Sequence, residues 1–347
     1  MSLHRKRRPD RMRGISLVEL MVGITLGLLL LLGLSSLYLS NSFARAEFNK
    51  SAEQIENGRY ALDVLARDLE LAGFMGAHHL AKTAAPSLPT ICEGGVADFG
   101  FALSPAVTMP VAVTVYKPGA LAPPCLPNYV PNTEVVAVRR VATNAVAPAA
   151  LVAGATYLQA SACALDTAPF VVGADPALFT LRNKTCDAAV AAPIWRYVVR
   201  IYYLASCDRC TAPADTIPTL KVAELGPTGL TSSSVAQGIQ TMHFDFGMDL
   251  DQDGSPDCYV ADPDVDNSAT CTSVPAYDWT QPPRNWQAVA TVRTSVLART
   301  TAPSAGWKDT RTYVLGGGLT LGPFDDQYKR RVYAQAMRLW NAPGVVN

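Results

Sequence analysis

The stretch that decides the fold is RMRGISLVELMVGITLGLLLLLGL, residues 11–34. Basic residues end at Arg13, and from Ile15 to Leu39 the run is apolar or small, with Glu19 as its one ionised side chain. Such a run is long enough to span a bilayer, which needs about 20 residues. A carboxylate there costs about 2–3 kcal/mol even on insertion scales, so Glu19 marks a functional position whose partner has to be identified.

Composition and charge limit the classes of protein. The chain has 347 residues, of which 49% are apolar and 17% charged, as is usual for a globular protein with one membrane segment. Residues 1–14 hold six Arg or Lys side chains and one Asp, and the remainder holds 23 basic and 28 acidic side chains. That remainder has no general electrostatic footprint for nucleic acid, so the sequence gives no evidence for a nucleic-acid partner.

Two ordinary explanations of the N-terminus are incomplete. A cleaved secretory signal has an apolar region of about 7–15 residues, followed by a cleavage site with small residues. Ala44-Arg45-Ala46 could be such a cleavage site, but the apolar run before it is longer than in a secretory signal. A plain signal anchor fits the length, with its basic side inside by the positive-inside rule. It leaves Glu19 unexplained.

A third explanation accounts for the carboxylate. The segment RGISLVELMVGITLGLLLL (13–31) resembles the signal of type IV prepilins and pseudopilins: a basic leader, Gly14, one residue that starts the mature chain, and Glu as the fifth residue of an apolar helix. The resemblance implies that a prepilin peptidase cuts between Gly14 and Ile15 and methylates the new amine. Glu19 would then pair with the Ile15 amine, on its own chain or a neighbouring subunit. Two opposite charges in a medium of low dielectric constant have a lower free energy as a pair than apart. The one departure is Ile15, where major pilins usually have Phe.

The resemblance and the patterning together predict a leader at 1–14, an N-terminal helix at 15–74 with its membrane part at 15–39, and a globular head at 75–347. Gly73 and Gly76 are the predicted stop signals of the helix. A break near residues 40–42, which would make two helices, is the alternative. The residues expected to lie near one helical face beyond the membrane part are Phe48, Ala52, Ile55, Leu62, Leu65 and Leu69.

Short runs rich in Val, Thr and Tyr predict strands in the head, and they follow one another without a long helical pattern. The sheet should therefore be mostly antiparallel, which gives an α+β, pilin-like fold. Stretches 81–90, 118–131 and 142–155 are rich in Ala and Pro and are predicted to be loops. The predicted strands are 111–116, 134–141, 195–205, 220–225, 240–248, 286–300, 311–315 and 330–340.

Several segments resemble one branch of this family, the PilW-type minor pilins, whose relatives are the J pseudopilins of type II secretion. The match rests on NGRYALDVLARDLELAGFMG (57–76), IPTLKVAEL (217–225), VAQGIQTMHFDFGMDLDQDGSPDCYV (235–260), WQAVATVRTSVLART (286–300) and YKRRVYAQAMRLWN (328–341). The resemblance implies a low-abundance subunit that joins other minor pilins in a complex that initiates assembly of the type IV pilus, at the filament tip.

The loop DLDQDGSPDCYV (249–260) predicts a calcium site. Asp249, Asp251, Asp253 and Asp257 occupy positions 1, 3, 5 and 9 of an EF-hand-like loop, with a glycine at position 6. Position 12 is Val260 instead of Glu, so the pattern is incomplete, and Asp262, Asp264 or Asp266 would have to supply further oxygens. The alternative is a solvated turn rich in Asp and Gly.

Eight cysteines follow the apparent export signal, and an even count there favours disulfides in an oxidising compartment. Because short loops close at the lowest entropy cost, the local pairs are expected. Cys207 and Cys210 form a C-x-x-C, for which a structural disulfide is favoured over a redox-active one, since no helix N-terminus follows to lower a thiol pKa. The expected pairs are Cys207 with Cys210, Cys258 with Cys271, Cys92 with Cys125, and Cys163 with Cys186.

The sequence contains no motif of a catalytic nucleophile, a zinc site or a nucleotide site, so we do not expect an enzyme. Calcium at the aspartate loop is the one candidate cofactor. The expected function is that of a minor pilin whose partners are other minor pilins, the major pilin, the prepilin peptidase and the inner membrane. Its head would be periplasmic before assembly and would enter the pilus fibre afterwards. The alternatives are a type II secretion pseudopilin and a membrane-anchored, calcium-dependent adhesin or binding module.

Overall fold

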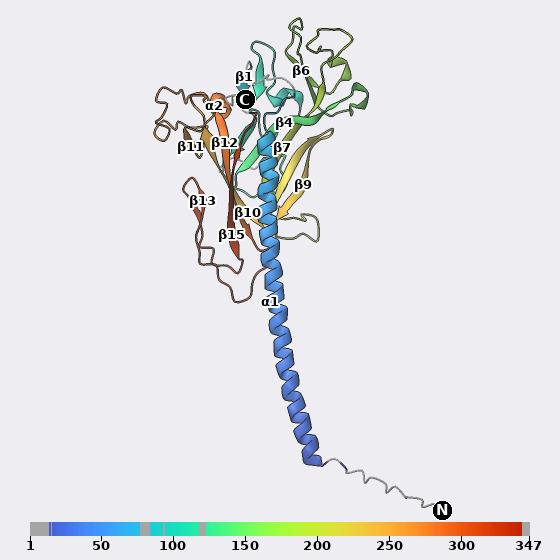
Figure 1. Ribbon diagram of the computed structural model, residues 1–347, viewed down its shortest axis with the longest axis vertical. Coiled ribbons are helices and arrows are strands. Elements are labelled where there is room, and N and C mark those ends of the chain that lie inside the picture. Colours follow the sequence, from blue (N-terminus) through green and yellow to red (C-terminus); the bar gives the residue numbers. More distant parts are fainter. Residues whose placement is uncertain (1–13, 15, 77–83, 93, 118–122, 342–347) are drawn as a thin grey trace, which may run out of the picture. The chain divides into compact units, whose positions relative to one another are not determined.

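The computed structural model describes residue 14 and residues 16–76, 84–92, 94–117 and 123–341 (Figure 1). The chain forms two compact units, residues 1–51 and residues 52–347. The described residues of the first unit are mostly helix, and the second unit contains the rest of that helix together with the head. Residues 1–13 of the predicted leader (1–14), and Ile15, lie outside the described residues.

The helix α1 (Leu17–Leu71) is continuous. It runs without a break through residues 40–42, so the alternative of two helices is wrong. In the interior of such a helix the backbone groups bond to one another along the chain, which is how a segment can be stable without water. Ala72 and Gly73 form a turn after it, and Gly73 has a φ of +76°, so this predicted stop coincides with the observed end.

Beyond residue 51, one face of α1 is buried, and the prediction of this face is confirmed for Leu62, Leu65 and Leu69 but not for the residues before them. Ile55 is 37% exposed, whereas Gly58 is buried. The ring of Tyr333 packs so closely on Gly58 that a Cβ at that position would clash with it. Phe48, also predicted for this face, lies in the other unit and is exposed. The buried residues of the helix are Gln54, Gly58, Ala61, Leu62, Leu65, Ala66, Asp68 and Leu69.

The head is built from β-sheets that are antiparallel except for one pair, as predicted. The exception is the short parallel pair of β1 and β2. The strands are β1 (Ala85–Ser87), β2 (Thr108–Pro110), β3 (Val113–Tyr116), β4 (Val135–Val146), β5 (Tyr157–Ala160), β6 (Phe170–Gly173), β7 (Ile194–Ala205), β8 (Thr219–Gly226), β9 (Gly229–Gln237), β10 (Ile239–Met248), β11 (Cys258–Val260), β12 (Val289–Arg299), β13 (Tyr313–Gly316), β14 (Leu319–Leu321) and β15 (Arg330–Arg338).

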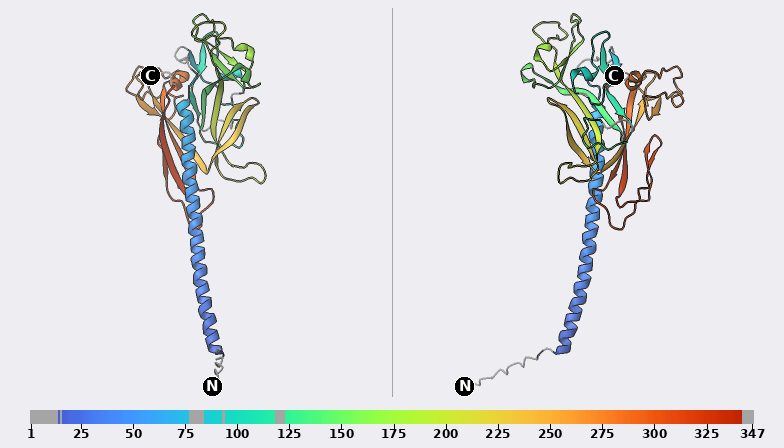
Figure 2. Two further views of the ribbon diagram at one scale, coloured as in Figure 1. Left: turned by 45° about the vertical axis from the view of Figure 1, so that its right-hand side comes forward. Right: turned by 180° about the vertical axis from the view of Figure 1, so that it is seen from behind.

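Two sheets dominate the head (Figures 1 and 2). The larger has seven strands, in the order β3-β4-β7-β5-β6, with β8 paired to β7 and β9 to β8. The smaller has the order β11-β10-β12-β15. The hairpin of β13 and β14 packs on the smaller sheet through Leu297, Tyr313 and Leu315. Together these strands and α1 make the α+β fold that the sequence predicts.

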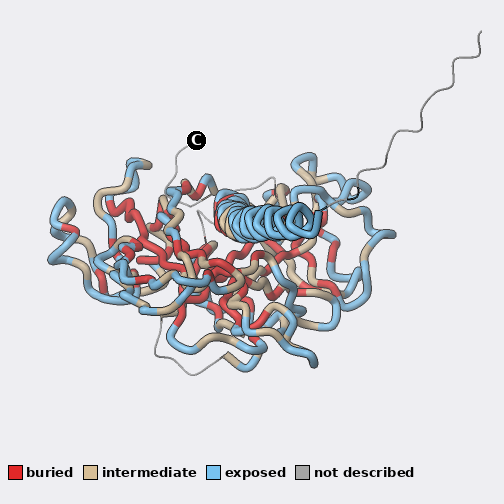
Figure 3. The backbone as a smooth tube through the Cα atoms, turned by 90° about the horizontal axis from the view of Figure 1, so that it is seen from below, coloured by how far each residue is buried: buried red, intermediate tan, exposed pale blue. Residues whose placement is uncertain are grey.

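A hydrophobic core joins the helix to both sheets. We call it the inner core, and it includes Leu65, Val136, Tyr202, Phe244 and Val296. A second one, the outer core, lies on the other face of the larger sheet and includes Phe99, Ala137, Leu158, Tyr197 and Ile201. Alternate residues of β4 and β7 enter the two cores, so this sheet is buried on both faces. Figure 3 shows the buried residues concentrated in the interior of the head, while most visible turns of α1 are exposed.

The sequence missed some elements. The strand β9 has the exposed polar run Thr231–Ser234, which lacks the apolar alternation of a strand. Trp286 was expected in a strand, but it lies in the short helix α2 (Pro282–Gln287), where it packs edge-on against Phe246. The predicted loop 142–155 is a strand as far as Val146. Three short 3₁₀ helices complete the list: η2 (Val96–Phe99), η3 (Pro148–Ala150) and η4 (Pro176–Leu178).

Candidate functional site

The first candidate is the start of the apolar helix. Gly14 is exposed, and α1 begins three residues later, with Glu19 in its first turn. The backbone N–H of Ser16 donates to Oε2 of Glu19 over 3.4 Å, and a carboxylate in the first turn interacts favourably with the helix dipole. The proposed partner of Glu19, the amine of Ile15, lies outside the described residues.

Glu19 has no charged neighbour along the helix. Between it and Arg45 the sequence contains no other ionised side chain. By length and composition α1 is able to cross a membrane, and its apolar part is exposed in this single chain. Within the described residues, Glu19 is a carboxylate without an ion pair at one end of an exposed apolar helix.

The second candidate is the aspartate loop between β10 and β11. It brings oxygens of Asp249, Asp251 and Asp257 within 4.8 Å of one another, a spacing that could hold a cation. Asp249 is buried, and its Oδ2 accepts the N–H of Gly254 at 2.9 Å. Burial raises the pKa of Asp249, as do the charges of Asp253 and Asp251, while backbone hydrogen bonds oppose the shift. A bound cation would relieve this repulsion.

The other predicted oxygens are engaged elsewhere. Asp253 lies outside the cluster of three, and its Oδ1 accepts the N–H of Ser255 at 2.7 Å. Asp264 accepts the indole N–H of Trp286 at 2.7 Å, and Asp262 and Asp266 each accept the N–H two residues on. Val260, at position 12, is buried in the strand ladder opposite Phe246. The loop thus joins two antiparallel strands instead of the two helices of an EF-hand.

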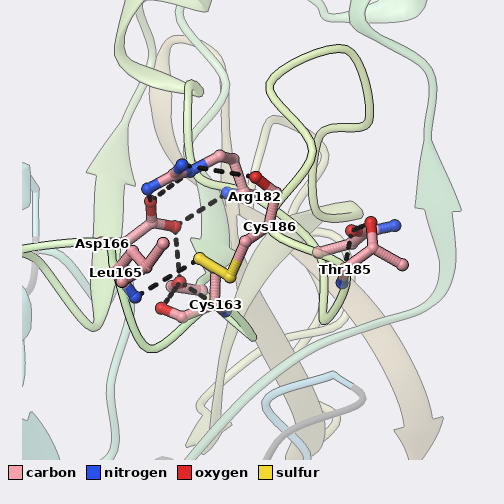
Figure 4. Close-up of a disulfide and its surroundings, with 8 residues drawn as sticks. Cys163, Leu165, Asp166, Arg182, Thr185 and Cys186 are labelled. Atoms are coloured by element: carbon pink, nitrogen blue, oxygen red, sulfur yellow. Dashed lines mark hydrogen bonds and ion pairs between the residues drawn. A yellow bond between two sulfur atoms is a disulfide. The ribbon is translucent and has the colours of Figure 1, made fainter.

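All eight cysteines are paired, and the four pairs are those expected from the sequence. Figure 4 shows Cys163–Cys186, beside which Arg182 donates to Asp166 through Nε at 2.8 Å. The N–H of Arg182 and the hydroxyl of Ser161 also donate to this carboxylate, and together they lower the pKa of Asp166 to about 2. The disulfides are Cys92–Cys125, Cys163–Cys186, Cys207–Cys210 and Cys258–Cys271.

A buried ionic cluster that the sequence analysis missed fixes α1 to the larger sheet. Asp68 of α1 is 3% exposed and accepts from Arg140 Nη2 at 3.1 Å and from Arg200 Nη1 at 3.0 Å. The hydroxyl of Tyr202 donates to the same carboxylate, and Glu224 binds the Nε of Arg200 at 2.9 Å. Burial and the nearby carboxylate raise the pKa of Tyr202. An Asp at an apolar helical position, with Leu65 and Leu69 around it, was the available signal.

A second missed cluster lies on the face of β10 that points away from the inner core, next to Gly316 and Gly317. His243 of β10 has its Nδ1 3.0 Å from Oε1 of Glu134, and its Nε2 3.4 Å from Oδ1 of Asp245. The ammonium of Lys117 lies 2.8 Å from the same Glu134 oxygen. Burial lowers the pKa of His243, but hydrogen bonds to Asp245 and Glu134 outweigh it and raise the pKa to about 9. The sequence signal was weak, because Glu134 is 109 residues away.

The comparisons with known proteins agree with the resemblance seen in the sequence. A model of the family described as type IV pilus-assembly protein W matches residues 201–341, which run from β7 to the residues after β15. No curated protein and no solved structure matches the chain. With the apolar N-terminal helix, the family match confirms the resemblance to PilW-type minor pilins and relates the chain to type IV pilus assembly.

Proposed function

We propose that this chain is a minor pilin: a structural subunit that helps to initiate type IV pilus assembly in a complex with other minor pilins, at the filament tip. The observation that carries the proposal is Glu19, the lone carboxylate in the first turn of an apolar helix that follows a basic leader and Gly14. The family match over residues 201–341 supports a role in pilus assembly.

The proposal includes a processing step and a location. A prepilin peptidase removes residues 1–14 by cutting after Gly14, and the amine of Ile15 is methylated. Before assembly, residues 15–39 anchor the chain in the bacterial inner membrane and the head, residues 75–347, lies in the periplasm. The subunit then enters the pilus fibre, where the helix 15–74 packs among those of the other minor pilins and the major pilin.

Glu19 has a specific role in this proposal. Its carboxylate neutralises the amine of Ile15 once both are removed from water, and an unpaired charge there would be strongly unfavourable. A type II secretion pseudopilin would use the same pairing and differ only in its companion subunits. A membrane-anchored adhesin would need neither the pairing nor the cut after Gly14.

The test is substitution of Glu19. Glu19→Ala should leave membrane insertion and cleavage after Gly14 intact, because the carboxylate is not part of the scissile bond and its loss makes the helix more apolar. Incorporation into sheared pili should fail, because deleting one partner of a buried pair typically costs roughly 3–5 kcal/mol. Glu19→Gln keeps the shape, and it should fail nearly as completely. Quantitative immunoblotting of pilus and membrane fractions gives the readout.

The control is Glu56→Ala, the same substitution at an exposed position of the same helix. It should enter pili at the wild-type level. N-terminal sequencing of the mature chain separates the alternatives, since a start at Ile15 supports a pilin and a start near Glu47 an ordinary exported protein. Wild-type incorporation of both Glu19 variants would contradict the pairing.

We also propose that the aspartate loop binds calcium, and the convergence of Asp249, Asp251 and Asp257 supports this. Calcium takes six to eight oxygens, which three carboxylates can supply in part, with backbone carbonyls and water completing the shell. Bound calcium would hold the loop between β10 and β11 in one conformation. This would stabilise the head without any catalytic role.

Calorimetric titration of the full-length chain in detergent tests the calcium site. Calcium should bind and raise the melting temperature, and both effects should disappear in Asp251→Asn and Asp257→Asn, which remove charge from the cluster. Asp262→Asn, an acidic residue outside it, is the matched control and should bind like the wild type. The absence of heat and of any thermal shift at millimolar calcium would refute the site.

A further inference from the structure

The disulfide Cys207–Cys210 has a cation beside one of its sulfurs. Nζ of Lys221 lies 3.4 Å from Sγ of Cys210 and donates to the carbonyl of Asp208 at 2.9 Å. Lys221 is on β8, paired with Tyr203 of β7, so the ladder fixes its position over the loop that joins these strands. In the described part of the chain, no other disulfide sulfur has a Lys or Arg nitrogen at this distance.

The two sulfurs of this disulfide differ in accessibility. Cys210 is half-buried, whereas Cys207 is only 6% exposed, and the hydroxyl of Ser206 lies 3.8 Å from the Sγ of Cys207. An ammonium beside Cys210 favours its thiolate over its thiol and therefore lowers the thiol pKa in the reduced form. Lys221 supplies the positive charge that a helix N-terminus supplies in other C-x-x-C sites.

Opening this disulfide would disturb the fold least. Its cysteines are 3 residues apart in sequence, against 13, 23 and 33 in the other pairs, so its loss frees the least chain entropy. The loop has other supports. Asp215 accepts the N–H groups of Asp208, Arg209 and Ile217 at 2.8–3.1 Å, and Gln237 donates to the Asp208 carboxylate at 2.8 Å.

We propose that Cys207–Cys210 is a site of thiol–disulfide exchange with a dithiol, a function separate from assembly. A thiolate of the dithiol attacks Sγ of Cys210, the bond between the two cysteines breaks, and Cys207 leaves as a thiolate that takes up a proton. The second thiolate of the dithiol then attacks the dithiol sulfur that is bonded to Cys210 in the mixed disulfide. This closes the dithiol's own disulfide and releases Cys210 as a thiolate beside Lys221. The dithiol is oxidised by two electrons, and the pair of cysteines is reduced.

Equilibrium with reduced and oxidised dithiothreitol tests the exchange. The full-length chain in detergent is held at graded ratios of the two forms, quenched with acid and alkylated, and each cysteine pair is quantified by mass spectrometry. Cys207–Cys210 should be half reduced at a ratio of reduced to oxidised dithiothreitol that is about tenfold lower than the ratio that half reduces any other pair. Lys221→Gln should raise this ratio about fivefold or more, whereas Lys221→Arg should keep it near the wild-type value. Lys184→Gln, an exposed lysine near Cys186, is the control and should have no effect.

The pH dependence of alkylation separates a charge effect from a structural one. In the selectively reduced protein, the rate at Cys210 should rise with a midpoint below the ordinary thiol pKa of about 8.5. Lys221→Gln should move the midpoint up and Lys221→Arg should keep it low. The proposal is wrong if Cys207–Cys210 is reduced together with the other pairs. It is also wrong if Lys221→Gln leaves both the ratio and the midpoint unchanged, and neither result bears on the role of Glu19.

Discussion

Individual residues show how burial changes chemistry in this head. His243 lies between two carboxylates, Glu134 on one side and Asp245 on the other, on the face of β10 that packs against Gly316 and Gly317. Its protonated ring is stabilised there in spite of its burial, and the ammonium of Lys117 beside Glu134 opposes this only in part. The same side chain in an exposed strand would be neutral above its ordinary pKa.

The His243 cluster predicts a pH dependence of stability. The folded-state pKa of about 9 lies above the ordinary 6.5, so folding favours the protonated ring. Its stabilisation is complete below pH 6.5 and is lost as the pH rises through 9, at up to about 1.4 kcal/mol per unit of pKa difference. Melting temperatures from pH 6 to 9.5 should therefore fall in the wild type.

The matching variant is His243→Gln, which cannot titrate. It should be less stable at pH 6 and should lose much of the fall between pH 6.5 and 9. Asp245→Asn should also flatten the profile, because it removes one of the two carboxylates that raise the pKa of His243. Parallel profiles for the wild type and His243→Gln would show that this ring does not set the pH dependence.

At the scale of elements, the joint between α1 and the larger sheet combines apolar packing with one buried charge. Leu62, Leu65 and Leu69 pack in the inner core, and Asp68 accepts from Arg140 and Arg200 beside them. Apolar side chains can pack with the helix in several rotations about its axis, whereas hydrogen bonds to guanidinium groups require one geometry. The cluster therefore fixes the rotation of the helix against the sheet.

Substitution at this joint should be far more costly than on the helix surface. Asp68→Asn leaves Arg140, whose side chain is 10% exposed, without its carboxylate, and a loss of roughly 3–5 kcal/mol is expected. Asp63→Asn is the control on the same helix, because its pair with Arg67 is exposed and should contribute about 0.3–0.5 kcal/mol. Thermal unfolding of both variants checks this. Equal losses would mean that the buried cluster contributes no more than a surface pair.

At the scale of the whole molecule, disulfides hold the connections between strands. Cys92–Cys125 closes a loop that spans β2 and β3, and Cys163–Cys186 closes the part of the chain around β6. Both loops also contribute residues to the hydrophobic cores, among them Phe99 and Val113 in the first and Phe170 in the second. The disulfides therefore add covalent links to segments that also pack in the cores.

The cost of removing a disulfide should increase with the length of its loop. In the chain-entropy description, replacing both cysteines of Cys92–Cys125 by Ala should cost nearly 4 kcal/mol, and those of Cys207–Cys210 about 2 kcal/mol. Comparing the melting temperatures of the two double variants tests the order. The reverse order would show that local strain or contacts, not loop closure, dominate.

Much of the architecture could be predicted from the sequence. The long helix, its end near Gly73 and most of the long strands follow from periodicity, the absence of proline and the positions of glycine, which are local properties. Strands with few apolar residues, such as β9, were missed because their pairing is decided by their neighbour β8. The buried face of α1 was predicted correctly at Leu62, Leu65 and Leu69, whereas the burial of Gly58 against Tyr333, far along the chain, was missed.

The sequence alone determined the features that depend on neighbours in the chain. These are the apolar helix with Glu19 in its first turn, the local cysteine pairs, and the aspartates that share one loop. Only the tertiary structure decided the clusters around Asp68 and His243 and the placing of Lys221 beside Cys210. The physical reason is that these charges meet through strand pairing and sheet packing, which bring together side chains that are distant in sequence.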